Sequence, residues 1–223
     1  DDEGSMAPCS RQYAEESRFE QEAPGLKRPG AFLCALDSAF VNTDQGVSRV
    51  SIQGTEGWVI RRASAADAPA VLHVFDDVIA WLVGMGNNAQ WGIEPWSALP
   101  RRVEQVTQAC ALPGAWVVEA SDGRILAALV LGDPMPYVPA ASEPEVYVRL
   151  LIAARDARAR GWGRRLLAFA DERARAAGVM RLRVDCYAGG TGDLVRFYQS
   201  CGYQRISTFD LEGWPGQLLG RRL

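Results

Sequence analysis

The sequence predicts a domain of the mixed α/β (α+β) class, in which a sheet is flanked by helices. Two observations carry this prediction. The spacing of apolar residues changes repeatedly between the helical and the strand period, and glycine or proline marks most of the changes. The expected order is strand, two helices, three strands, helix, strand, helix and one or two strands. Because helices and strands do not alternate one by one, repeated βαβ units are not expected.

The first half of this domain is expected to hold two helices between a strand and a hairpin. A capping-box pattern at Ser64 and Asp67 precedes a helix with one apolar face, and Pro100 opens the next helix. The dipeptide Asp122-Gly123 is typical of a hairpin turn. The expected elements are a strand over residues 58–62, helices over 65–83 and 100–111, and hairpin strands over 115–120 and 124–132.

In the second half, a glycine ends each of two further helices. Gly178 follows a helix expected over residues 161–177, and Gly202 follows a short helix expected over 193–201. Strands are expected over 145–152, where the pattern alternates, over 179–187, and once or twice over 204–223.

Charge divides the chain into two parts. The 223 residues carry a net charge of −3, but residues 1–57 hold 5 basic and 10 acidic side chains, whereas residues 58–223 hold 19 and 17. This balance excludes a strongly basic nucleic-acid-binding protein. It also predicts an N-terminal extension over residues 1–57 and a compact domain over 58–223. Residues 1–5, which precede Met6, resemble a cloning scar.

The extension is rich in Pro-Gly dipeptides, and we expect it to pack against its own domain or against a second protomer in a homodimer. The five cysteines are odd in number and form no Cys-x-x-Cys pair, which predicts reduced thiols in a cytoplasmic protein. No apolar run approaches the roughly 20 residues of a membrane span, so no membrane partner is expected. His73 is the only histidine, which excludes a histidine-based metal site.

One glycine-rich segment carries a chemical signal. The pattern Arg158-x-x-Gly161-x-Gly163 stands between a predicted strand and a predicted helix. Glycine lets the backbone approach a ligand, and the unpaired N–H groups of a helix start bind pyrophosphate. Arginines at 158, 160, 164 and 165 add positive charge. Taken alone, the pattern fits a plain tight turn before a helix equally well.

A second segment changes that balance. In Leu194-Val-Arg-Phe197-Tyr198, a short helix carries two aromatic residues and ends at Gly202. Such a pair alone is more often part of a core. Together, the two segments resemble the GCN5-related N-acetyltransferase (GNAT) family, and the resemblance extends over residues 58–223. The stretches 184–190 and 213–217 are similar to a bacterial subgroup that acts on small molecules.

The resemblance implies a mostly antiparallel, twisted sheet that splays at an acyl-CoA site. It implies that acetyl-CoA donates an acetyl group to a primary amine through a tetrahedral intermediate, with coenzyme A as product and no metal. Backbone N–H groups of Leu150, Leu151 and Ile152 would polarise the thioester. Thr191 stands where many members carry asparagine. The remaining cofactor contacts implied are Arg158, Ala159, Arg160, Gly161, Trp162, Gly163, Arg164, Thr191 and Phe197.

Tyr198 corresponds to the family's tyrosine beside the CoA sulfur, where it would protonate the departing thiolate. The base that deprotonates the amine is expected to be a carboxylate or a water chain, because only one histidine is present. Candidates are Glu145, which we place first, Asp185 and Glu94. Asp185 has a second interpretation, in which it ties down the turn at Gly189-Gly190.

The acceptor pocket is expected between the first two helices, their connecting loop and the proline-rich loop 133–144. Its candidate residues are Trp81, Trp91, Trp96, Tyr137, Tyr147 and Asp185. The tryptophans favour an acceptor with apolar or planar parts. Acetylation of a protein N-terminus or lysine is the alternative enzyme activity. A non-catalytic acyl-CoA-binding module is the alternative of another class, and the presence of Tyr198 argues against it.

Overall fold

The computed structural model describes residues 57–223. The extension predicted over residues 1–57 therefore lies outside the described residues, except for Gly57. Everything below concerns the part of the chain that begins there.

A single sheet of seven strands forms the centre of this part, in the order β1-β2-β3-β4-β5-β7-β6. Neighbouring strands are antiparallel except β4 and β5, which are parallel. The tail contains two strands, so the predicted mixed α/β class with a mostly antiparallel sheet is confirmed. The strands are β1 (Trp58–Arg62), β2 (Ala115–Ala120), β3 (Ile125–Gly132), β4 (Val146–Ala153), β5 (Arg181–Tyr187), β6 (Gln204–Leu211) and β7 (Trp214–Arg222).

The predicted helices are present, with small shifts at their ends. The helix expected from residue 65 begins as a 3₁₀ turn, Ala65–Asp67, and continues as α3. The capping box at its start is confirmed, since the Ser64 N–H donates to Asp67 at 2.8 Å. The α-helices are α3 (Ala68–Gly84), α4 (Pro100–Cys110), α5 (Trp162–Ala176) and α6 (Asp193–Ser200).

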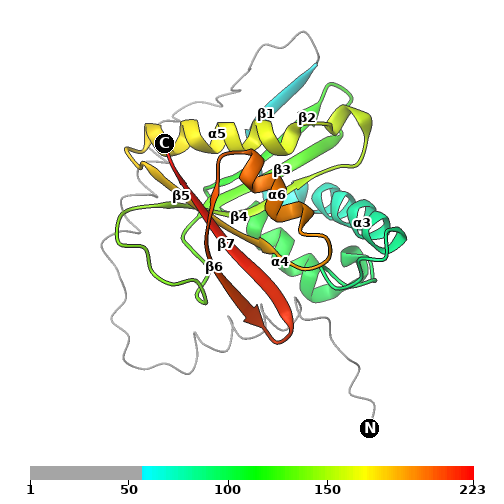
Figure 1. Ribbon diagram of the computed structural model, residues 1–223. Helices are drawn as coiled ribbons and strands as arrows, with labels where there is room; N and C mark the ends of the chain where they lie inside the picture. Colours follow the sequence, from blue (N-terminus) through cyan, green and yellow to red (C-terminus); the bar gives the residue numbers. More distant parts are fainter. Residues whose placement is uncertain (1–56) are drawn as a thin grey trace, which may run out of the picture.

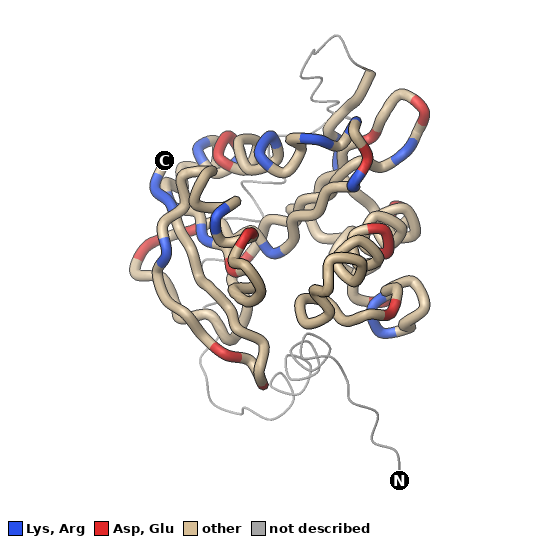
Figure 2. Tube along the Cα trace, turned by 45° about the vertical axis from the view of Figure 1, so that its right-hand side comes forward, with Lys and Arg blue, Asp and Glu red and all other residues tan. Residues whose placement is uncertain are grey.

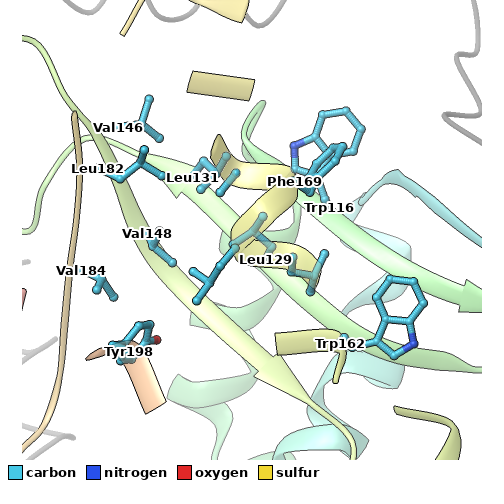
Figure 3. Close-up of a cluster of buried hydrophobic side chains, with 14 of the residues drawn as sticks. Trp116, Leu129, Leu131, Val146, Val148, Trp162, Phe169, Leu182, Val184 and Tyr198 are labelled. Carbon is cyan, nitrogen blue, oxygen red and sulfur yellow. The ribbon is translucent and has the colours of Figure 1, made fainter. Parts of the chain in front are cut away.

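The helices form two layers on the sheet, with α5 and α6 on one face and α3 and α4 on the other (Figure 1). Alternating residues of β2 show why. Trp116 and Val118 belong to the core beneath α5, whereas Val117 belongs to the core beneath α3. The Trp116 ring meets Phe169 of α5 edge-on, with 4.9 Å between ring centroids (Figure 3). Burial of such aromatic pairs stabilises the attachment of α5 to the sheet.

The sheet splays between β4 and β5. These two strands pair only from Val146 to Val148, opposite Leu182 to Val184. Just beyond, β4 contains a bulge: Leu131 pairs with Val148 and Val130 with Leu150, so Arg149 is an extra residue. A bulge bends its strand and increases the local twist. The splay implied by the family resemblance is therefore present, and it opens the centre of the sheet.

Candidate active site

A cleft of about 810 Å³ lies where β4 and β5 separate. Segments far apart in the sequence form its walls: the ends of both strands, α6, the end of α3, the loop after α3, and Trp214 at the start of β7. The predicted site residues that line it are Leu150, Leu151, Ile152, Thr191, Phe197, Tyr198, Trp81, Trp91, Trp96, Tyr137 and Asp185. The structure thus brings together most of the residues that sequence reasoning selected.

The backbone of residues 150–152 borders the cleft on one side. These residues lie beyond the last β4–β5 pair, so the edge of β4 that faces β5 has no strand partner there. Their other edge pairs with β3, between Val130 and Ala128. Backbone groups on an unpaired strand edge are available to a ligand. Successive N–H groups of a strand point to opposite edges, and the Ala154 N–H donates to the Leu126 carbonyl on the β3 side at 2.8 Å. The N–H groups of Leu150 and Ile152 therefore also face β3, so the oxyanion-type role expected for Leu150, Leu151 and Ile152 suits only Leu151.

The glycine loop leads directly into α5. Gly161 has a φ of +85°, a left-handed conformation that glycine adopts without strain. The first intrahelical bond of α5 is from the Arg165 N–H to the Gly161 carbonyl, at 3.1 Å. The N–H groups of residues 162–164 precede it and have no intrahelical partner, which suits an anionic ligand.

The two motifs identified in the sequence touch each other in space. A Cβ atom added at Gly163 would lie 3.1 Å from Cζ of Phe197, so the absence of a side chain lets α6 approach the start of α5. Arg164 strengthens this contact, because it donates to the Ser200 carbonyl at 2.7 Å and to the Ser200 hydroxyl at 2.9 Å. Its guanidinium therefore joins the two helices instead of extending toward a phosphate.

Several other loop residues also differ from the expected side-chain contacts. Arg158 donates to Asp156 and Asp122, which ties the loop to the β2–β3 turn. Ala159 and Trp162 are 2% and 1% exposed, so only their backbones can face a ligand. The Ala159 N–H already donates to the Asp156 carbonyl at 3.0 Å. The side chain of Arg160 is exposed and has no hydrogen-bond or ion-pair partner within residues 57–223, which leaves its guanidinium available, whereas its backbone N–H donates to the Ala157 carbonyl at 3.2 Å.

Thr191 lies just before the N-terminus of α6, and its hydroxyl donates to the Asp193 carboxylate. Arg196 donates to the Thr191 carbonyl at 2.6 Å. The Thr191 side chain therefore organises the start of α6, while the residue itself still lines the cleft. The family resemblance placed Thr191 among the cofactor contacts, and its position in the lining agrees with that placement.

Tyr198 lies on α6 against the inner wall of the cleft, next to Val184 (Figure 3). Its ring packs against Phe197 and Tyr203, with centroids 5.2 and 5.7 Å away, and the residue is 5% exposed. Burial raises the pKa of its phenol well above the usual value. No described residue hydrogen-bonds the hydroxyl. A neutral phenol at this position is able to donate a proton to a ligand in the cleft.

Glu145 does not fit the role of general base. Both of its carboxylate oxygens accept bonds from the Arg183 guanidinium, and Glu145 and Arg183 are 9% and 2% exposed. It is also absent from the lining of the cleft. A carboxylate held by a buried arginine is not available to a substrate amine. Glu94 fails for a different reason, because it is exposed and lies outside the lining.

Asp185 has the placement that Glu145 lacks. It lies on β5 in the wall of the cleft, and its carboxylate accepts the Tyr147 hydroxyl at 2.5 Å and the Tyr137 hydroxyl at 3.1 Å. Burial raises the pKa of Asp185 above its ordinary range, and the two tyrosines partly offset that rise. The other carboxylate in the described lining, Asp193, is held by Thr191 and Arg196.

Two aromatic groups form part of the walls of the cleft that also contains Asp185. On the α3 side, Phe75 stacks on Trp96 at 4.2 Å, and Trp91 lies 5.3 Å from Phe75. On the β7 side, Trp214 packs 5.6 Å from Tyr187 and donates its indole N–H to the Gln90 carbonyl at 3.1 Å. That bond joins the loop after α3 to β7 across 124 residues.

Trp214 was not among the predicted site residues, although its Gly-Trp-Pro-Gly segment was conspicuous in the sequence. Trp81 lies at the exposed rim, where the Arg155 guanidinium stacks 3.7 Å from its ring. Tyr147 is fully buried and reaches the site only through its bond to Asp185. The residues predicted to bind the acceptor therefore have three positions. Most line the cleft, Trp81 lies at its exposed rim, and Tyr147 lies behind the lining, where it holds Asp185.

Charge is distributed without a dominant patch over the described residues. Figure 2 shows basic and acidic residues interspersed along α5. Residues 57–223 contain no group of three or more His, Cys, Asp or Glu side chains that could hold a metal ion. None of the helices in this part of the chain combines the length and apolarity needed to cross a membrane.

Comparisons with known proteins agree with this geometry. The model of the acetyltransferase (GNAT) family matches residues 79–203, more than half of the chain. Similar solved structures include a GNAT acetyltransferase from Listeria monocytogenes, with 18% identity over 74% of this chain and 95% of that one and a TM-score of 0.57. The PaiA N-acetyltransferase of Thermoplasma acidophilum, solved with coenzyme A, has 14% identity over 75% of this chain and 99% of that one, with a TM-score of 0.58.

An agmatine N-acetyltransferase has 18% identity over 75% of this chain and 100% of that one, with a TM-score of 0.53. At these identities the likeness to solved structures concerns the fold. A search of curated proteins found no match.

Proposed function

Because this chain belongs to the GNAT acetyltransferase family, and is therefore an N-acetyltransferase with acetyl-CoA as co-substrate, we propose that its acceptor is the primary amine of a small molecule. The observation that carries the proposal is that Asp185 shares one cleft with two aromatic groups, one on the α3 side and one on the β7 side. The bond from Trp214 to Gln90 joins two segments of the lining of this cleft. An extended protein substrate needs an open groove, whereas a small amine fits between such walls.

We assign the acetyl-CoA site to the described backbone groups that have no partner, at the start of α5 and along the free edge of β4. The N–H groups of residues 162–164 at the start of α5 would bind the pyrophosphate, with Arg160 beside them. Gly161 fits this role because the space where its side chain would lie is open, whereas Gly163 lets Phe197 pack against the same helix start. Phe197 and the free edge of β4 at residues 150–152 would line the path of the pantetheine arm toward Tyr198.

The chain's own residues would then perform three tasks around the thioester that acetyl-CoA supplies. Asp185 accepts a proton from the substrate ammonium, so that the amine nitrogen becomes nucleophilic. The backbone N–H group of Leu151, which faces the free edge of β4, stabilises negative charge on the carbonyl oxygen. Tyr198 donates its proton to the sulfur as the carbon–sulfur bond breaks.

We further propose the organisation of the whole chain. Residues 58–223 are assigned to the acetyltransferase domain, and residues 1–57 to an arm that packs on this domain or on a second protomer. The free thiols of Cys110, Cys186 and Cys201 support a reducing, cytoplasmic location.

A screen of amines with acetyl-CoA, read by thiol release, tests the function. We expect small aromatic or apolar primary amines to be acetylated, and peptides with free N-termini or lysines to react far more slowly. Calorimetric titration with acetyl-CoA serves as the control for cofactor binding. Absence of binding at millimolar acetyl-CoA would contradict the proposed cofactor site, and preferential acetylation of peptides would contradict the proposed acceptor.

Replacing Tyr198 with phenylalanine is expected to lower kcat by roughly 10- to 100-fold, because protonation of the leaving thiolate is useful but not obligatory. The KM for acetyl-CoA is expected to stay within about twofold. Tyr203→Phe is the matched control, since its ring packs against Tyr198 while its hydroxyl is buried without a described partner. Equal kcat in the two variants would show that Tyr198 is not the proton donor.

A further inference from the structure

Arg149 is a cation in the wall of the cleft that the mechanism above does not use. It is the extra residue of the β4 bulge and is only partly exposed. Within residues 57–223, its guanidinium forms no hydrogen bond, ion pair or ring contact. Desolvating an arginine without a partner is costly, and this cost is recovered when an anionic ligand binds.

The surroundings of Arg149 make room for its side chain. A Cβ atom added at Gly132, near the end of β3, would lie 3.2 Å from Cδ of Arg149. The aliphatic stem therefore packs over a residue without a side chain. Arg155, the other arginine in the lining, is exposed and stacks on Trp81 at the rim. The two arginines thus differ in that only Arg149 lacks a described contact for its charge.

Asp185 contributes the opposite charge to the same cleft. It lies on β5, across the splay from Arg149 on β4, and the two side chains form no ion pair with each other. Among the described residues, the Asp185 carboxylate has only tyrosine hydroxyls as side-chain partners, and the Arg149 guanidinium has none. A cleft with separated and unneutralised charges of opposite sign is complementary to a zwitterion.

From this arrangement we infer that the acceptor is an amino carboxylate with a large apolar or aromatic side chain. Its ammonium faces Asp185, its carboxylate pairs with Arg149, and its side chain packs among Trp91, Trp96 and Trp214. The inference rests on the proposed function and specifies its substrate class. An arginine can bind a carboxylate through two parallel hydrogen bonds, which fixes the orientation of the amine as well as its affinity.

The reaction balances with acetyl-CoA as the only co-substrate. The ammonium nitrogen loses two protons and forms a bond to the acetyl carbon, while the carbon–sulfur bond breaks. One proton reaches the sulfur, and the other passes to Asp185 and from there to solvent. The products are the N-acetyl amino carboxylate and coenzyme A. The carboxylate takes no part in bond making, so Arg149 acts in substrate binding.

Pairs of acceptors that differ only in the carboxylate test the inference. Tryptophan and tryptamine, tyrosine and tyramine, and phenylalanine and phenethylamine are compared at saturating acetyl-CoA. We expect the acid of at least one pair to exceed its amine by roughly 100-fold in kcat/KM, since an analogue that leaves a buried polar group unpaired is strongly rejected. Equal rates within all pairs, or acetylation of the amines alone, would overturn the inference and leave the acetyltransferase function intact.

Variants at Arg149 test whether this side chain causes the preference for amino acids over the matching amines. Arg149→Met is expected to reduce the ratio of acid to amine to within about threefold, with an unchanged KM for acetyl-CoA, whereas Arg149→Lys retains part of the ratio. Arg155→Met is the matched control and is expected to leave the ratio unchanged. A ratio that survives in Arg149→Met would overturn the assignment.

A carboxylate could also reach Arg149 on the acyl group instead of the acceptor. Succinyl-CoA with tryptamine, phenethylamine or tyramine as acceptor distinguishes the two sources. We expect succinyl-CoA to be a poor donor in both the wild type and Arg149→Met. Efficient succinyl transfer that is lost in Arg149→Met would place the anion on the donor and overturn the inference. A protein that neither binds acetyl-CoA nor acetylates any amine would instead contradict the proposed function itself.

Discussion

Replacing Arg183 with methionine is expected to destabilise the folded domain by about 3–5 kcal/mol, because it leaves the buried Glu145 carboxylate without its partner. The Arg183 Nε and Nη2 atoms donate to the Glu145 carboxylate, and Nη1 donates to the Pro139 carbonyl at 2.9 Å. The arginine is 2% exposed, so water cannot replace these bonds. Urea unfolding of the two proteins measures the difference.

Two further variants show whether the effect belongs to the buried pair. The double variant Arg183→Met/Glu145→Leu removes both charges and is expected to recover much of the loss, since apolar replacement of a buried pair is often tolerated. Arg222→Ala is the exposed control, because its pair with Glu143 lies at the surface and should contribute less than about 1 kcal/mol. A loss below 1 kcal/mol in Arg183→Met would contradict the argument.

The same pair explains why sequence reasoning selected the wrong base. Glu145 begins a strand beside the motif, and a solvated residue or a catalytic one was expected there. Its true partner is 38 residues away on β5, and nothing in the local pattern indicates that pairing. Long-range pairing of charges depends on strand register, which hydrophobic periodicity alone does not determine for two strands separated by a helix.

Features governed by local rules were predicted well. The capping box at Ser64, the hairpin at Asp122-Gly123 and the glycine ends of α5 and α6 depend on residues close together in the sequence. The glycine loop and the Phe197-Tyr198 helix were also placed correctly, because each is one continuous segment.

Contacts between segments escaped prediction even where the residues were conspicuous. Trp214 lines the cleft, and its indole donates to the Gln90 carbonyl of a distant loop. Arg164 and Arg158 were assigned to a phosphate from their charge, yet their donors are used by Ser200 and by two aspartates. An arginine count near a glycine loop therefore overestimates the charge that is free to meet a ligand.

Replacing Asp185 with asparagine is expected to have the largest effect on activity. The change preserves the shape of the side chain but removes the proton acceptor, so kcat/KM for the amine should fall by roughly 100- to 10,000-fold. The KM for acetyl-CoA should stay within about twofold, because Asp185 lies on the acceptor side of the cleft. Steady-state rates with each substrate varied in turn separate these effects.

The pH profile provides a second measurement on the same residue. Burial raises the pKa of Asp185, so its carboxylate is lost as the pH falls through a value above the ordinary aspartate range. The wild-type profile should therefore lose activity on its acid side through the titration of Asp185. That limb should be absent from the asparagine variant, whereas a limb that comes from protonation of the amine itself remains in both.

Tyr147→Phe distinguishes a catalytic carboxylate from one that is merely structural. The Tyr147 hydroxyl donates to Asp185 at 2.5 Å and favours its charged form, so its removal should move the acid limb to higher pH while the carboxylate remains. Tyr187→Phe is the control, since its ring lies in the same wall but has no hydrogen bond to Asp185 among the described contacts. If the wild type and Asp185→Asn have the same acid limb, and Tyr147→Phe does not move it, the limb belongs to the amine or to another group and Asp185 is not the proton acceptor.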